Sequence, residues 1–558
     1  MSPALFLLVA CGADLIRDTD ADGYIDALDC QPYNPSVNPS ANDATGDGVD
    51  QNCDGVDGTD VDGDGQASVE SGGEDCNDWD PLAYTGAYET CEDRIVSDCA
   101  LTIREASALC WGDLSLAEAH FRVYGEMPSE EIGVSVAGAG DVNGDGFNDL
   151  ILGSWGDTPN GPWSGSSHVV YGPLTGSADI SATSDARLEG EAEGDFAGHR
   201  VAGTGDFNGD GFDDVLVGAH DNDEGGAHAG AAYLILGPVS GTMGLADAPL
   251  KLLGERAGAW AGWAVAPAGD VNDDGYQDIL VGATATASEA DGLGAVHLIL
   301  GQELSTDEVR SLSEADATLR GVTWNDATGV STTGGGDLNG DGLDDLLVGA
   351  NEVLPGGPGV VYAVMSPVYG DFDLRDADAT LRGESPYDTV GESVASAGDV
   401  DGDGNADVLI GAPQGVDPHL GPGRAYLVLG PLWGERPLDT ADAVLVGEAY
   451  GDRAGYSVAA AGDVNGDQHA DLLVGTYQAL RADDPPGLAY LVLGPVSGHV
   501  DLGEADGRLV GESTHGRAGF SVASAGDVNG DGLDDLLIGA IGEREFAGAA
   551  YVFHGRSY

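Results

Sequence analysis

The sequence predicts an all-β fold, in which a seven-bladed β-propeller follows an acidic, cysteine-containing N-terminal segment. One nine-residue acidic loop recurs seven times, at intervals of 62 to 67 residues, and begins at Asp141, Asp206, Asp270, Asp337, Asp399, Asp463 and Asp527. A period of this length is typical of repeat architectures. Strand patterns flank every loop, and the two ends of the array carry complementary parts of one unit. We therefore expect three regions, at residues 1–11, 12–118 and 119–558.

Each repeat unit contains four predicted strands, as residues 455–512 illustrate. Residues 456–460 alternate like a half-buried strand, and residues 472–475, after the acidic loop, are wholly apolar. Two further strands are expected at 489–495, which ends in proline, and at 508–512. Four strands in each of seven units match the blades of a β-propeller. A linear solenoid is the alternative, but it requires capping repeats with a distinct polar face, and the sequence contains no such repeat.

The ends of the array predict that the ring is closed by the N-terminal strand. The last unit has strand patterns at 521–524, 536–539 and 550–554, and the chain then ends at Tyr558 without a fourth strand. An orphan fourth strand at 119–126 precedes the first unit and matches the fourth strands at 186–191 and 443–448. We expect this strand to complete the last blade, which leaves no free strand edge at the seam.

The acidic loops have the composition of calcium sites. Positions 1, 3, 5 and 9 are Asp or Asn in every loop, and position 6 is Gly in six of the seven. Position 7 varies, which is typical of a ligand that binds through its backbone carbonyl. Calcium takes six to eight oxygen ligands, whereas magnesium prefers to keep its waters. Asp, Asn and Gly also form ordinary turns, but turns alone do not predict seven copies at one spacing.

The predicted cation ligands are grouped by loop. They are Asp141, Asn143, Asp145, Phe147 and Asp149; Asp206, Asn208, Asp210, Phe212 and Asp214; Asp270, Asn272, Asp274, Tyr276 and Asp278; Asp337, Asn339, Asp341, Leu343 and Asp345; Asp399, Asp401, Asp403, Asn405 and Asp407; Asp463, Asn465, Asp467, His469 and Asp471; and Asp527, Asn529, Asp531, Leu533 and Asp535. We expect about seven calcium ions in the propeller.

Residues 12–118 differ from the repeats in composition, because they contain few apolar residues. Two loops fit the same acidic template, and their predicted ligands are Asp18, Asp20, Asp22, Tyr24 and Asp26, and Asp60, Asp62 and Asp64. The stretch 14–93 resembles thrombospondin type 3 calcium repeats, which ions and disulfides hold together in place of a core. A disordered acidic stalk is the alternative.

Cysteines occur only before residue 111, and six remain if Cys11 is set aside: Cys30, Cys53, Cys76, Cys91, Cys99 and Cys110. An even number in an exported, loop-rich segment predicts disulfides. Six cysteines allow 15 pairings, of which we favour the sequential one. A zinc site is less favoured, because the neighbouring Asp and Asn residues are hard ligands.

The N-terminus and the charge bear on location and partners. Residues 8–11, Leu-Val-Ala-Cys, resemble a bacterial lipobox with Cys11 as the lipidated residue; an ordinary apolar N-terminus is the alternative. We expect an exported protein, either a bacterial outer-membrane or cell-surface lipoprotein or an extracellular protein. There are 97 acidic and 20 basic residues, and the formal net charge is −77. Such a surface repels nucleic acid and anionic membranes, so membrane contact is expected only through a lipid anchor.

The repeat resembles the FG-GAP repeat in the N-terminal propeller of integrin α chains. Residues 519–522, 526–532 and 536–540 carry the resemblance, and 411–413 read Gly-Ala-Pro. It covers residues 119–558 and implies a seven-bladed propeller with calcium in hairpin loops on one face. The Phe-Gly pair is mostly Ala-Gly here, and all seven loops are complete, whereas animal integrins use only some. No transmembrane helix or partner-binding legs follow, so integrin-type signalling is not implied.

The sequence favours a binding protein over an enzyme. It contains no nucleophile elbow, phosphate loop or zinc-protease motif, and we expect no catalytic residues. We expect an exported, calcium-binding adhesion protein that binds a protein or glycan through one propeller face. The variable loops 155–167, 219–229 and 414–424 are predicted to lie on the face opposite the calcium loops. These loops or the adjoining connections between blades contain Trp163, Trp260, Trp324, Tyr387 and Tyr450, which suit a binding surface; packing between blades is the alternative. A structural surface protein and a polysaccharide-acting enzyme are the alternatives.

Overall fold

The computed structural model describes two separate units. The described residues are 18–22, 24–25, 28–41, 49–53, 111–284, 292–304, 308–324, 326–351, 357–413, 421–477 and 485–556. The larger unit, Trp111–Arg556, is the propeller. It therefore includes residues 111–118, and the expected boundary between residues 118 and 119 lies eight residues after the boundary between the two units.

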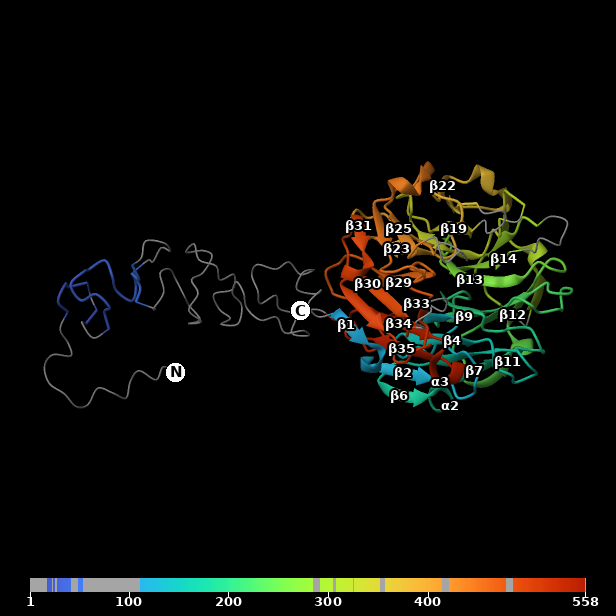
Figure 1. The fold of residues 1–558 in the computed structure, drawn as a ribbon, viewed down its shortest axis with the longest axis horizontal. Coiled ribbons are helices and arrows are strands. Elements are labelled where there is room, and N and C mark those ends of the chain that lie inside the picture. Colours follow the sequence, from blue (N-terminus) through green and yellow to red (C-terminus); the bar gives the residue numbers. More distant parts are fainter. Residues whose placement is uncertain are drawn as a thin grey trace. The chain divides into compact units, whose positions relative to one another are not determined.

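Seven twisted sheets surround a central axis (Figure 1), which confirms the predicted seven-bladed propeller. Blade 1 contains β3 Val136–Gly140, β4 Asp149–Ser154, β5 Ser166–Val170 and β7 Ala186–Glu189; blade 2 contains β8 Arg200–Gly205, β9 Asp214–Ala219, β10 Ala231–Ile235 and β12 Leu250–Leu253; blade 3 contains β13 Ala261–Gly269, β14 Asp278–Ala283, β15 Ala295–Ile299 and β17 Ala317–Arg320; blade 4 contains β18 Ser331–Gly336, β19 Asp345–Ala350, β20 Val360–Val364 and β22 Ala379–Arg382. Blade 5 contains β23 Val394–Gly398, β24 Asp407–Ala412, β25 Arg424–Val428 and β27 Ala443–Val446; blade 6 contains β28 Ser457–Gly462, β29 Asp471–Gly475, β30 Leu488–Val492 and β32 Gly507–Val510; blade 7 contains β33 Ala518–Gly526, β34 Asp535–Ala540, β35 Ala549–Phe553 and β2 Phe121–Tyr124.

Each sheet also has a fifth, outermost strand that the sequence did not predict. It pairs in parallel with the fourth strand, and the chain of the following blade supplies it. In blade order these strands are β11 Gly241–Gly244, β16 Glu308–Ser311, β21 Gly370–Asp373, β26 Gly434–Pro437, β31 Gly498–Asp501, β1 Gly112–Ser115 and β6 Gly176–Asp179. Every blade is thereby connected by backbone hydrogen bonds to the chain of its neighbour.

A single helical turn follows the outermost, fifth strand of each sheet and leads into the fourth strand of the next blade. These turns are η3 Leu116–Glu118, η4 Leu245–Asp247, η5 Leu312–Glu314, η6 Leu374–Asp376, η7 Leu438–Thr440, η8 Leu502–Glu504 and α2 Ile180–Thr183. The first residue of each turn, Leu or Ile, is at most 2% exposed. This side chain anchors the connection in the core. A further short helix, α3 Glu543–Phe546, precedes β35.

The hydrophobic core consists of seven clusters, one at each interface between adjacent blades. The second strand of each blade, such as β4, is buried along its whole length because both of its faces pack against neighbouring blades. This burial explains why the second strands are wholly apolar in sequence, whereas the inner strands alternate.

The N-terminal strand closes the ring as predicted. Strand β2 pairs antiparallel with β35 in the register Phe121↔Val552 to Tyr124↔Ala549, and the two strands lie side by side in Figure 1. Phe121 and Val123 contribute to the cluster between blades 7 and 1. Strand β1 extends blade 6 in parallel with β32. Residues before the first repeat therefore complete both of the last two sheets.

The N-terminal unit contains the predicted disulfide between Cys30 and Cys53, whose Cα atoms are 5.6 Å apart. This pair agrees with sequential connectivity; the other four cysteines of the expected set lie outside the described residues, as do Cys11, Asp26, Asp60, Asp62 and Asp64. No helix among the described residues is long and apolar enough to span a membrane.

Candidate functional site

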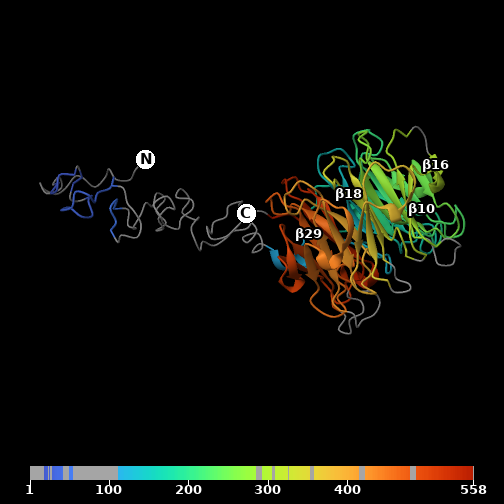
Figure 2. The ribbon, with the colours of Figure 1, turned by 90° about the horizontal axis from the view of Figure 1, so that it is seen from above.

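All seven acidic loops lie on one face of the ring, because each joins the first strand of a blade to the second. We call this side the acidic-loop face. The connections between the second and third strands, and those between blades, lie at the other ends of the strands, on what we call the variable-loop face. Figure 2 shows the ring turned by 90°, with loops at both ends of the strands.

The first acidic loop shows how its polar groups are arranged. One carboxylate oxygen of Asp141 accepts hydrogen bonds from the backbone N–H groups of Gly144 and Asp145 at 2.7 and 2.9 Å. Its other oxygen accepts from Gly146 at 2.9 Å, and Asp145 accepts from the N–H of Phe147 at 3.0 Å. Gly144 and Gly146 adopt φ values of +76° and +93°. These bonds fold the loop around its first aspartate, and the same pattern recurs around Asp527.

The aspartate at position 9 is the most buried of the predicted ligands in each loop. Both oxygens of Asp149 accept backbone hydrogen bonds, from Val142 at 2.9 Å and from Gly172 at 2.8 Å. This residue therefore ties the loop to the end of the third strand, a role that the sequence did not predict. A carboxylate has about four acceptor sites, so both oxygens retain capacity for a cation. The equivalent residues, all with no exposed surface, are Asp149, Asp214, Asp278, Asp345, Asp407, Asp471 and Asp535.

Burial raises the pKa of these seven carboxyl groups far above the usual value. The pKa of Asp149 rises to about 7 and that of Asp471 to about 8, first because of burial and then because of the carboxylates at positions 5 and 1. Backbone hydrogen bonds offset only part of this effect. A cation in the loop would supply the missing positive charge. The donor set fits a hard cation, because it consists of carboxylate, amide and carbonyl oxygens.

Two groups of predicted ligands have oxygens within 4.8 Å of one another. One group is Asp399, Asp401 and Asp407, and the other is Asp18, Asp20 and Asp22 in the N-terminal unit. A further cluster, Glu130, Asp157 and His168, satisfies the same distance criterion. Two members of that cluster already have protein partners: Asp157 binds Arg187 at 2.7 Å, and the His168 ring contacts Ser184 at 3.1 Å.

Neighbouring loops contact one another around the ring, which the sequence did not predict. In six of the seven loops, the backbone N–H at position 8 donates to the carbonyl oxygen at position 1 of the preceding loop, as from Asp213 to Asp141 at 3.2 Å. The carboxylate of Asp213 also accepts from the N–H of Asp141 at 2.7 Å. The position 7 ring of Phe212 fills the space where Gly144 lacks a side chain. Each loop therefore helps to fix its neighbour.

Two loops depart from this pattern. Gln468 occupies position 6 of the sixth loop at φ 72°, and Asp273 occupies position 4 of the third loop at φ 57°, in left-handed backbone that other loops give to glycine. Side chains rarely adopt this conformation, so both loops are strained. The sequence identified Gln468 but not Asp273.

The repeats match a known family model. The model described as "FG-GAP repeat" matches residues 197–235, 261–299, 390–428, 454–492 and 518–553. These are FG-GAP repeats. In the N-terminal unit, residues 29–58 and 75–103 match a model described as "Putative metal-binding motif". The thrombospondin type 3 resemblance of that segment stays a prediction.

Integrin α chains are among the similar curated proteins. Integrin alpha-IIb of Mus musculus is 39% identical over 171 residues, which cover 29% of this chain and 16% of that protein. Integrin alpha pat-2 of Caenorhabditis elegans is 30% identical over 233 residues, which cover 38% of this chain and 18% of that protein. The chain thus spans less than a fifth of the length of these relatives. A solved structure titled "Crystal structure of BBS1N in complex with ARL6DN, soaked with lead" aligns with a TM-score of 0.38 at 11% identity and covers 77% of this chain and 96% of that one.

The variable-loop face of the FG-GAP propeller carries a ring of residues in left-handed backbone. They occur once per blade, two residues before the repeat glycine, with φ values from 54° to 57°: Glu131, Phe196, Trp260, Ala327, Thr389, Arg453 and Arg517. The conformation belongs to the repeat, but the side chains differ from blade to blade. Six of these side chains are partly exposed and Thr389 is buried, so the backbone is fixed at positions where the side chain varies.

Exposed aromatic side chains also gather on this face. Trp163, Trp324, Tyr387 and Tyr450 are 43%, 56%, 50% and 72% exposed. They lie where the sequence predicted aromatic residues of the binding face. Trp260 differs, because it is partly buried and stacks on Trp263 with ring centroids 5.4 Å apart.

Two aromatic clusters flank the centre of this face. The first spans blades 1 to 3 and contains Trp155, Trp163, Phe196, His199, His220, Trp260 and Trp263. The second spans blades 6 and 7 and contains Tyr456, Tyr477 and Phe520. Among the described residues, the Nδ1 atoms of His199 and His220 and the Nε1 atom of Trp260 are buried without a hydrogen-bond partner. Burial lowers the pKa of His220 to about 4, so its ring is neutral.

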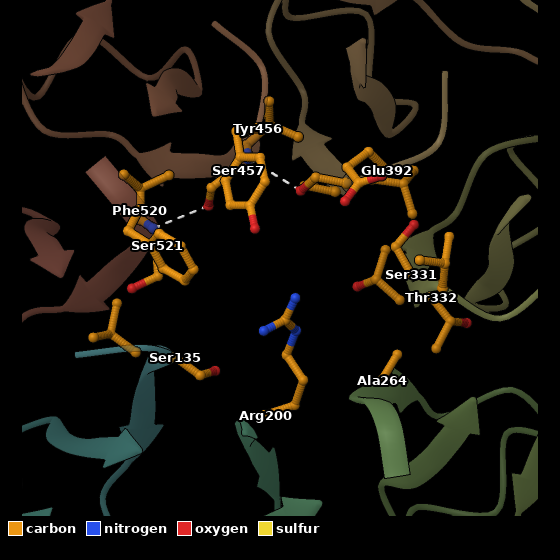
Figure 3. Close-up of a pocket in the computed structure, with 18 of the residues that line it drawn as sticks. Ser135, Arg200, Ala264, Ser331, Thr332, Glu392, Tyr456, Ser457, Phe520 and Ser521 are labelled. Carbon is orange, nitrogen blue, oxygen red and sulfur yellow. Dashed lines mark hydrogen bonds between the residues drawn. The ribbon is translucent and has the colours of Figure 1, made fainter. Parts of the chain in front are cut away.

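A cavity of about 260 Å³ lies at the start of the inner strands (Figure 3), and all seven blades line it. One residue per blade, six positions before the acidic loop, forms what we call the channel ring: Ser135, Arg200, Ala264, Ser331, Ser393, Ser457 and Ser521. This ring was not predicted from the sequence, although alignment of the seven repeats places Arg200 among five serines.

Proposed function

We propose that this chain is an exported, calcium-binding cell-surface adhesion protein that binds a protein or glycan through its variable-loop face. The proposal includes a lipid anchor at Cys11 for the membrane connection. The FG-GAP repeats and the similarity to integrin α chains support a cell-surface role. The metal-binding motif of the N-terminal unit supports a further cation site there.

Calcium is the cation that best fits the acidic loops. The predicted ligands at positions 1, 3, 5 and 9 and the carbonyl at position 7 provide at least five oxygens, and calcium accepts six to eight in flexible geometry. When bound, calcium would neutralise the carboxylates that burial now penalises. Because each loop is hydrogen-bonded to the next, cations would stiffen the whole acidic-loop face. A partner would then bind the opposite side of the ring, the variable-loop face.

The observation that carries the binding role is the aromatic surface on the variable-loop face. Five of the eight exposed large hydrophobic residues of the described propeller lie there: Met127, Trp163, Trp324, Tyr387 and Tyr450. Aromatic residues are enriched at binding surfaces, where they provide large contact areas at low entropic cost. Buried nitrogens without partners are rare in a self-contained core, so those of His199, His220 and Trp260 also favour a polar ligand.

The test compares aromatic variants on and off this face. The full-length protein is applied to a glycan array and to intact cells in calcium, and the double variant Trp324→Ala/Tyr450→Ala is compared with Trp433→Ala. Trp433 is a matched control, because it is 61% exposed but precedes β26 on the outer edge. We expect the double variant to lose at least tenfold in affinity and the control to bind normally. Equal binding by all three proteins would contradict the proposed face.

A further inference from the structure

Arg200 breaks a structural pattern of the channel ring. The serines of this ring bond to the next blade: the Oγ of Ser135 accepts from the N–H of Val201 at 3.1 Å, and the Oγ of Ser331 donates to the carbonyl of Gly391 at 2.8 Å. Ser393, Ser457 and Ser521 make equivalent bonds. Arg200 makes no such bond, and its side chain extends into the cavity (Figure 3). The arginine is therefore not needed to hold the ring together.

The guanidinium group of Arg200 is poorly compensated. It donates one hydrogen bond, from Nη1 to the carbonyl oxygen of His199 at 3.1 Å, and no ion pair of Arg200 occurs among the described residues. A guanidinium has five N–H donors, so most of its capacity is unused. Burial lowers the pKa of this arginine, while Tyr456 and Glu392 act in the opposite direction. Arg200 is only partly buried and faces the cavity, so its unused N–H donors are accessible to an anion that enters it.

Glu392, the carboxylate that acts on the pKa of Arg200, does not neutralise the guanidinium group. Glu392 is directed to Asn351, whose side-chain amide donates to it at 2.8 Å, and it forms no ion pair with Arg200. The chain has 97 acidic residues, so a counterion for Arg200 could have been supplied within the fold. The guanidinium group of Arg200 therefore lacks an internal counterion at the centre of a very acidic protein, which is what a binding site for an anion requires.

The walls of the cavity restrict the shape of the ligand. Tyr456 and Phe520 line it, and their ring centroids are 5.2 Å apart. The volume of about 260 Å³ lies below the range of about 300–1,000 Å³ that is typical of drug-sized ligands. The cavity therefore has room for about one sugar ring. Aromatic faces suit the C–H face of a sugar.

We infer that the cavity binds a sugar ring that carries one carboxylate, with Arg200 as the anion receptor and Tyr456 and Phe520 as the stacking walls. This inference rests on the proposed binding role of the variable-loop face and names the ligand class. A guanidinium binds a carboxylate through two parallel hydrogen bonds. An acidic peptide is less favoured, because a segment with several charges would meet the negative field of the protein, whereas a single carboxylate matches the single guanidinium.

The test uses glucuronate as the probe and glucose as its neutral counterpart, with the full-length protein in calcium. Arg200→Ser introduces the residue that five blades already have, so it should fold at least as well as the parent protein. Arg200→Lys keeps the charge but loses the bidentate geometry. Arg320→Ser is the charge-matched control, because Arg320 lies on β17 and pairs with Asp371 at 2.9 Å. Binding is measured by saturation-transfer NMR and calorimetry, and folding by thermal melting.

We expect glucuronate to bind at least tenfold more tightly than glucose. Arg200→Ser should lose about 10- to 100-fold in affinity with an unchanged or raised melting temperature, Arg200→Lys should be intermediate, and Arg320→Ser should match the parent. Failure of the parent protein to bind glucuronate, or equal binding by Arg200→Ser, would overturn the inference. Binding of a glutamate tripeptide in preference to glucuronate would overturn the sugar assignment. If cell binding survives in Arg200→Ser while glucuronate binding never occurs, the proposed function stands and this inference fails.

Discussion

Closure of the ring by residues that precede the repeats predicts a sharp difference between two truncations. Deletion of residues 1–126 removes β1, η3 and β2, and deletion of residues 1–110 removes none of them. The protein without residues 1–126 lacks five side chains that are buried in the full-length fold: Trp111, Leu116, Phe121, Val123 and Tyr124, each at most 6% exposed. It also leaves the edge of β35 without a partner.

The magnitude follows from burial. Each such side chain stabilises the fold by about 1.5–3 kcal/mol. Five of them give roughly 8–15 kcal/mol, comparable to the entire net stability of a typical domain, about 5–15 kcal/mol. The protein without residues 1–126 should therefore unfold or aggregate, whereas the protein without residues 1–110 should melt close to the full-length protein.

The assay is thermal melting in calcium, with light scattering to follow aggregation through the exposed strand edge. The single variant Phe121→Ala in the full-length protein provides an intermediate point, with an expected loss of about 3–5 kcal/mol. If the two truncated proteins melt at the same temperature, the N-terminal strand does not close the ring in solution.

Three further predictions concern the acidic loops. At roughly 1 mM calcium and dissociation constants of about 0.1–1 mM, each site adds about 0.4–1.4 kcal/mol, so chelation should remove roughly 3–10 kcal/mol; an unchanged melting curve in EDTA would contradict calcium binding. The Asp399 loop, with four side-chain carboxylates, should bind most tightly and the Asp463 loop, strained at Gln468, most weakly; site-by-site occupancies in the opposite order would refute this ranking. Because the pKa values of the position 9 carboxyls are raised to about 6–8, the folded protein binds more protons than the unfolded chain, so in chelator the melting temperature should fall as pH rises from about 4 to 8, and a rise over that range would count against their burial as ionisable groups.

Much of the fold could be predicted from the sequence because it depends on periodic, local features. The acidic loops place each first and second strand, and the fragment at 119–126 matches other fourth strands closely enough to predict closure. The fifth strand was missed because it is short, exposed and polar, so it has no strand periodicity. The Leu or Ile that follows it in every unit is a usable signal, since this residue anchors the turn in the core.

The acidic loops could be predicted only as separate units. Their sequence indicates the ligands at positions 1, 3, 5, 7 and 9, but the bond from the N–H of Asp141 to the carboxylate of Asp213 joins residues 72 positions apart and requires the ring geometry. The structural role of Asp149 was missed for the same reason, because its partner Gly172 belongs to another turn. Arg200 is a different case. Aligned repeats show an arginine where most blades have serine, but the role of this residue depends on the cavity that its side chain enters.

The central claim, that every blade holds a calcium ion, can be tested by anomalous diffraction from crystals of the full-length protein grown in calcium. We expect one calcium peak in each of the seven acidic loops, coordinated by the side chains at positions 1, 3, 5 and 9 and the carbonyl at position 7. Loops that remain without a cation at saturating calcium, with position 9 held only by its two backbone N–H donors, would contradict it.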